Sequence, residues 1–112
     1  MSENLCKLET KKALKYWQTP LGFKDWDISL RFRKMEDADG RNYWVPNKKK
    51  MAITIDPTTK HDAEFVLLHE LVHIFLNINN TNMDALDYIL EGLVDTVAKS
   101  FIRMRKNQGH KL

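Results

Sequence analysis

The stretch "LLHELVHIF", residues 67–75, places two histidines and a glutamate inside an otherwise apolar run. Such a run usually becomes a buried helix, and a buried charge or imidazole without a partner costs several kcal/mol. His69, Glu70 and His73 therefore need groups elsewhere in the chain that satisfy them. How the other elements pack around residues 67–75 consequently decides the fold.

The composition bounds the class of protein. The chain has 112 residues, 43% of them hydrophobic and 29% charged, so we expect a single domain over residues 1–112 with a small core. No apolar run reaches the roughly 18 residues of a membrane span, and the N-terminus lacks the apolar stretch of a secretory signal. Cys6 is the only cysteine, which excludes an intramolecular disulfide and fits a reducing, cytoplasmic setting.

The net charge of +3 is a mild basic excess. Basic residues cluster only in residues 47–51 and 103–111, and short runs of this kind are usually solvated loops or helix ends. No motif that reads nucleic acid accompanies them. We therefore expect neither a nucleic acid nor a membrane as the partner.

The hydrophobic pattern predicts three helices and three strands. Helical spacing is found in residues 3–18, 60–79 and 83–107, and strand-like patterns in residues 26–35, 43–45 and 51–56. Asp39-Gly40 is a strong hairpin signal between the first two strands. The order predicts an α+β fold: an N-terminal helix, a small, mostly antiparallel three-stranded sheet, and two consecutive helices.

His69 and His73 lie four residues apart, which places both imidazoles on one face of a helix. Two such imidazoles can bind one zinc ion at about 2.0–2.1 Å. Glu70 is rotated away from that face and is better placed to act as a general base. His-Glu-x-x-His on a helix is typical of zinc metalloproteases. The alternative is a core helix with one histidine bonded to a backbone carbonyl and the other exposed.

A hydrolytic zinc site needs a third protein ligand and an open fourth position. Glu91 follows His73 by eighteen residues. The polar break at 77–82 lets the last helix fold back over the helix that carries the two histidines. We predict Glu91 as that ligand. Asp95, one turn later, is predicted to accept the second ring N–H of His69. Glu91 and Asp95 belong to a polar stripe on this predicted helix, which consists of Asp84, Tyr88, Glu91 and Asp95. The alternative interpretation is that this stripe simply faces solvent.

Two further residues bear on the site. Gly92 lies inside a good helix pattern, where glycine costs about 1 kcal/mol relative to alanine. A close approach to the facing helix would explain it, and so would simple packing. Cys6 could hold the site latent as a metal ligand, although a single cysteine near a terminus is more often inert.

The pair of motifs "HELVH" (69–73) and "EGLVD" (91–95) resembles the gluzincin metallopeptidases, in which an aspartate follows the glutamate ligand by four residues. The short chain and the order of elements resemble the minigluzincins, which have a minimal zincin-like domain. The resemblance implies a zinc endopeptidase with ligands His69, His73 and Glu91. It makes Glu70 the general base and proton shuttle, and Asp95 the support of the ligand shell.

The resemblance also implies a peptide or protein substrate along an edge strand before the zinc helix, a place that residues 51–55 occupy. Larger gluzincins have a further subdomain with a tyrosine or histidine that steadies the oxyanion. A chain of 112 residues leaves no room for it, so Tyr88, or less strongly His110, is the candidate oxyanion donor, and the alternative for both is a structural role. Minigluzincins resemble zymogens or homo-oligomers, and the tail at 107–112 could cover the cleft here.

Two alternatives stay open at this point. The first is a peptide-binding or regulatory module without significant turnover, in which zinc stabilises a small fold by joining two helices. The second is a DNA-bound protease. That class closes its site with a third histidine, so Glu91 and the modest charge argue against it.

Overall fold

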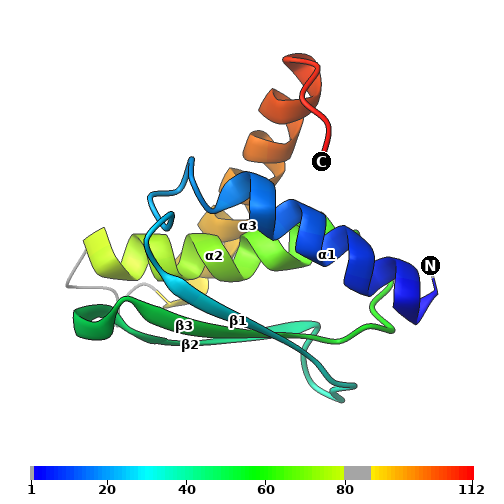
Figure 1. The fold of residues 1–112 in the computed structure, drawn as a ribbon, viewed down its shortest axis with the longest axis horizontal. Helices are drawn as coiled ribbons and strands as arrows, with labels where there is room; N and C mark the ends of the chain where they lie inside the picture. Colours follow the sequence, from blue (N-terminus) through cyan, green and yellow to red (C-terminus); the bar gives the residue numbers. More distant parts are fainter. Residues whose placement is uncertain (1, 80–86) are drawn as a thin grey trace.

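The chain forms two layers, with helices packed over one face of a three-stranded sheet (Figure 1). The computed structural model describes residues 2–79 and 87–112, without the side chains of residues 79 and 87–90. Its elements are α1 (Glu3–Trp17), β1 (Asp27–Phe32), β2 (Gly40–Val45), the 3-10 helix η1 (Pro46–Lys48), β3 (Lys50–Ile55), α2 (Ala63–Asn79) and α3 (Asp87–Asn107). The predicted α+β class and the order of elements are confirmed. No helix in the described ranges combines the length and the apolarity needed to cross a membrane.

The strand order is β1-β3-β2, with β3 parallel to β1 and antiparallel to β2. The sheet is therefore mixed, and the prediction of a mostly antiparallel sheet is wrong. The predicted hairpin at Asp39-Gly40 is wrong too, because β1 and β2 lie on opposite sides of β3. Asp39 instead ends a crossing segment, and Gly40 is the first residue of β2.

Residues 51–55 do not form an edge strand, so that prediction must be corrected. They belong to β3, which is hydrogen-bonded on both sides. Hydrophobicity explains the order: Met51, Ile53 and Ile55 are each at most 3% exposed, and the most apolar strand takes the centre. The outer strands carry the charged side chains that protect sheet edges, such as Arg31 and Arg41.

Helix α2 lies at the centre of the molecule and contacts α1, α3, β2 and β3. Its side chains at Leu67, Leu68, Leu71 and Ile74 are completely buried. A helix that is apolar around most of its circumference is stable only when it is covered on most sides. The enclosure of α2 leaves one stripe uncovered, the stripe that carries His69 and His73.

Helix α1 contributes its buried face to the same core. Ser2 caps it by accepting a hydrogen bond from the Leu5 backbone N–H at 3.1 Å. Cys6 is 1% exposed, and this burial raises the pKa of its thiol. Cys6 is enclosed in the core and is not among the described side chains that could hold a metal ion together, so latency through Cys6 is wrong for this structure.

A buried ion pair joins the three helices. Arg105 of α3 donates to Glu64 of α2 twice, from Nη2 to Oε1 at 2.6 Å and from Nε to Oε2 at 2.7 Å. Trp17 of α1 donates from Nε1 to the same carboxylate at 2.8 Å, and Arg105 Nη1 donates to the His110 carbonyl at 2.7 Å. Both charged side chains are less than 10% exposed. The geometry is the two-pronged pairing that offsets the desolvation of both charges.

Replacing Arg105 by methionine tests this pair. We expect the free energy of unfolding to fall by about 3–5 kcal/mol, because Glu64 is left buried and charged with Trp17 as its donor. Urea unfolding measures the change, and Arg103→Met on the exposed surface is the control. A loss below about 1 kcal/mol for the Arg105 variant would contradict the assignment.

Asp56 turns the chain after β3 and ties it to the segment that follows β1. Its carboxylate accepts hydrogen bonds from the Met35 N–H at 2.9 Å, the Thr58 N–H at 2.8 Å and the Thr58 hydroxyl at 2.6 Å. The Met35 bond, and then those from Thr58, lower the pKa of Asp56. Strand β3 ends at Ile55, one residue before the predicted end of the third strand.

The lowered pKa of Asp56 predicts a pH dependence of stability. A carboxyl group whose pKa is lower in the folded than in the unfolded state stabilises the fold above its unfolded pKa of about 4. That stabilisation is lost as the pH falls through the folded pKa. We therefore expect the difference in unfolding free energy between the unsubstituted chain and Asp56→Asn to shrink from pH about 5 to about 2. Denaturant titrations at each pH measure it, with exposed Asp25→Asn as control; a constant difference would contradict the prediction.

Candidate metal centre

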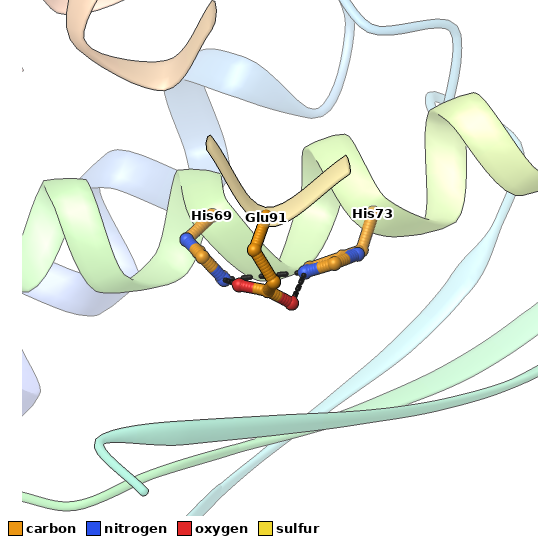
Figure 2. A group of neighbouring side chains, drawn as sticks. All are labelled: His69, His73 and Glu91. Atoms are coloured by element: carbon orange, nitrogen blue, oxygen red, sulfur yellow. Dashed lines mark hydrogen bonds and ion pairs between the residues drawn. The ribbon is translucent and has the colours of Figure 1, made fainter. Parts of the chain in front are cut away.

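Helices α2 and α3 bring together the three predicted metal ligands (Figure 2). Glu91, in the second turn of α3, reaches between the two imidazoles that α2 presents one turn apart. Its Oε1 lies 2.8 Å from His73 Nε2, and its Oε2 lies 3.2 Å from His69 Nε2. The two Nε2 atoms are 3.2 Å apart. Three potential ligand atoms thus face one point.

The separation of the two imidazole nitrogens matches that of two zinc ligands. A tetrahedral site with bonds of about 2.0–2.1 Å holds its ligand atoms about 3.3 Å apart. The two Nε2 atoms are 3.2 Å apart, and with one oxygen of Glu91 they form a group whose atoms all lie within 4.8 Å of one another. Two imidazoles and one carboxylate are also the ligand set of one class of catalytic zinc site.

The hydrogen bond of His69 to Asp95 orients the imidazole so that Nε2 faces Glu91. His69 Nδ1 lies 2.8 Å from Asp95 Oδ1, and an ionised carboxylate only accepts, so Nδ1 is the donor. In a neutral imidazole the lone pair is then on Nε2, which faces the Glu91 carboxylate. A proton on Nε2 or a metal cation between the two groups removes the repulsion between these electron pairs. The predicted contact between Asp95 and His69 is present, and its orienting effect is what a metal-bound histidine uses.

A cleft of about 960 Å³ lies over these residues. Its walls are the segment 37–42, which enters β2, and the facing surfaces of α2 and α3. The ligand side chains differ in exposure: His69 and His73 are 20% and 16% exposed, while Glu91 is 58% exposed. Helix α2 therefore forms the floor of the site, and α3 contributes its open side.

Glu70 lies outside the group of His69, His73 and Glu91 that could hold a metal ion. It is 6% exposed and lines the cleft on the side of β2. Its Oε2 accepts a hydrogen bond from Asn42 Nδ2 at 3.0 Å. Among the described residues, the group that could hold a metal ion consists of His69, His73 and Glu91. Glu70 is therefore not a metal ligand in this arrangement.

The explanation that Gly92 permits a close approach of the facing helix is wrong. A Cβ atom built there meets no atom of the described residues within 4 Å, so no close helix approach requires the glycine. The glycine with a close approach is Gly40, where a Cβ would lie 3.1 Å from Val66 Cγ1 and 3.2 Å from Glu70 Cγ. Strand β2 therefore lies directly on the side chain of Glu70.

Alanine at these two glycines should act in opposite directions. We expect Gly92→Ala to raise the free energy of unfolding by about 1 kcal/mol, through helix propensity alone. Gly40→Ala should lower it by about 1–3 kcal/mol, because Val66 or Glu70 must shift. Thermal and urea unfolding of both variants measure the pair, and a stabilising Gly40→Ala would contradict the packing.

The other predicted residues fall in different places. Tyr88 belongs to α3, but its side chain lies outside the described part, and so does all of Asp84. His110 packs edge-on against Tyr16 of α1, with ring centroids 6.1 Å apart, and does not line the cleft. An oxyanion role for His110 and a covering role for the tail at 107–112 are therefore wrong for this structure. His61 is exposed and lies on the cleft rim, where its Nε2 is 3.7 Å from Asp39 Oδ2.

Gly40 and Asn42 are not predicted as site residues, because Asp39-Gly40 predicts a turn and the second strand is predicted only from residue 43. Strand alternation was the available signal: Gly40, Asn42 and Trp44 are the less exposed positions of β2, and side chains two apart share a face. The Glu64–Arg105 pair was missed as well. A glutamate at the start of an apolar helix was its only trace in the sequence.

Comparison of the chain with protein-family models, with curated proteins and with solved structures found no match in any of the three. The resemblance to gluzincins therefore rests on the motifs at 69–73 and 91–95 and on the geometry of the residues in them.

Proposed function

We propose that the protein is a zinc-dependent metalloendopeptidase of the gluzincin type. The observation that carries the proposal is the convergence of His69, His73 and Glu91, whose ligand atoms lie within 4.8 Å of one another, beside a glutamate that is not part of the group. A carboxylate next to such a site, on the same cleft, is the arrangement that metal-assisted hydrolysis of a peptide bond needs.

The three ligands would hold one zinc ion, which, when bound, polarises a scissile carbonyl and increases the acidity of a water. Glu70 takes the proton of the attacking water and later gives it to the leaving amine nitrogen. Asp95 keeps the His69 ring in the tautomer and orientation that direct Nε2 to the site. Helix α2 carries the base and two ligands, so the helix fixes the backbone positions from which these three side chains extend.

The substrate strand is assigned to β2 in this proposal, in place of residues 51–55. Strand β2 is hydrogen-bonded on one side only, to β3, and its residues Gly40, Arg41 and Asn42 line the cleft. An extended peptide can add to such an edge through main-chain hydrogen bonds. It would then lie between β2 and the ligands on α2.

Peptide hydrolysis by Glu70→Gln tests the mechanism. We expect the turnover number to fall by about 10²–10⁴-fold with zinc content unchanged, because the base is lost while the ligands remain. A metal chelator should abolish the activity of the unsubstituted chain, and added zinc should restore it. Glu36→Gln, a change of the same kind outside the cleft, is the control. Full activity in the Glu70 variant would reject the mechanism.

Elemental analysis of the purified chain identifies the ligands. We expect one zinc per unsubstituted chain, and we expect the variants His73→Ala and Glu91→Gln to lose this zinc.

One observation favours the second candidate, a zinc-stabilised peptide-binding module. The ligands join α2 to α3, so a bound metal would stabilise the fold whether or not it turned substrate over. In that case Glu70→Gln leaves all properties unchanged, and His73→Ala lowers the melting temperature. The cytoplasmic setting and assembly into homo-oligomers stay predictions of the sequence under either function.

A further inference from the structure

Strand β2 holds the side chain of Glu70 from two sides. Asn42 donates from Nδ2 to Glu70 Oε2 at 3.0 Å, and within the described chain it is the one group that donates to this carboxylate. The backbone at Gly40 closes on the aliphatic part of Glu70, where a Cβ would be 3.2 Å from Cγ and 3.5 Å from Cδ. Side chains two apart on a strand share a face, so both contacts come from one side of β2.

This double contact fixes which carboxylate oxygen is available. Every buried side-chain nitrogen and oxygen of the described residues has a partner. The bond from Asn42 occupies Oε2, whereas Oε1 accepts no hydrogen bond from those residues. Since every buried oxygen has a partner, Oε1 is not a buried atom. Oε1 is therefore the oxygen free to take a proton in the cleft that Glu70 lines.

We propose that Asn42 is a positioning residue for Glu70: its amide holds Oε2 so that Oε1 points to the place where the attacking water is deprotonated. The inference rests on the proposed hydrolytic function. A glutamate side chain has three rotatable torsions, and helix α2 fixes only the position of its Cα and Cβ atoms. Without the amide, the carboxylate can rotate toward other donors, and a misplacement of about 1 Å costs up to about 100-fold in rate.

The placement of Asn42 on β2 also makes the effect separable from substrate binding. Pairing of a peptide with the strand edge uses main-chain groups, which a change of side chain leaves in place. The metal ligands are on α2 and α3 and do not contact Asn42 through any described hydrogen bond. Loss of the amide should therefore act on the chemical step and leave the other properties of the site in place.

The test compares peptide hydrolysis by the unsubstituted chain, Asn42→Leu and Glu70→Gln, with zinc content and unfolding measured on each. Leucine has a similar volume and no donor. For Asn42→Leu we expect kcat to fall roughly 10- to 100-fold, with KM within about twofold and one zinc per chain retained. Asn42→Asp, which keeps the shape and cannot donate when ionised, is the second variant if leucine prevents folding, and kcat should fall there too. Asn47→Leu, in η1 outside the cleft, is the matched control and should keep its kcat.

The outcomes separate this inference from the proposed function. If Glu70→Gln abolishes hydrolysis and the Asn42 variants keep the full kcat, the positioning role is overturned and the metallopeptidase proposal stands. If the Asn42 variants lose zinc, or raise KM as much as they lower kcat, Asn42 has a structural or substrate-binding role instead, which also overturns the inference. If the zinc-loaded, unsubstituted chain hydrolyses no peptide, both proposals fall together.

Discussion

The packing of α3 against α2 is the constraint on which the rest of the structure depends. Polar side chains join the two helices in two regions of α2, at Glu64 through Arg105 and at the histidines through Glu91 and Asp95. The first contact is a buried, doubly hydrogen-bonded ion pair that involves only protein groups. It fixes α3 through protein groups alone, and Glu91 of α3 lies close to the two histidines of α2. Preorganisation of this kind reduces the free-energy cost of assembling a metal site from separate segments.

The two contacts differ in their surroundings, and this difference suits their different tasks. Glu64 and Arg105 are enclosed beside Trp17 in the core, where a lost partner would leave a costly unpaired charge. Glu91 is more than half exposed, so its carboxylate can be reached from the cleft. One end of the helix pair is thus built for stability and the other for access.

Strand β2 connects the sheet to this site. Because β3 takes the central position, the chain must cross from β1 at one edge to β2 at the other, and that crossing brings the segment 37–42 over α2. The free edge of β2 and its contacts with Glu70 both follow from the crossing. Had the first two strands formed the predicted hairpin, β2 would have been a neighbour of β1, and the polar groups around Glu70 would have come from elsewhere.

The sequence by itself determined the elements whose signals are local. A histidine pair four residues apart, an apolar run around it and a Glu-x-x-x-Asp pattern one loop later are readable because helical periodicity fixes which side chains share a face. The prediction of the Asp95–His69 contact succeeded for the same reason, since both residues follow from those two periodicities. Only the tertiary structure decided the strand order, the glycine that must stay small and the partner of Glu64. Each of these depends on which segments, distant in the sequence, pack into the buried positions beside α2. The residues next to each position in the sequence do not determine that packing.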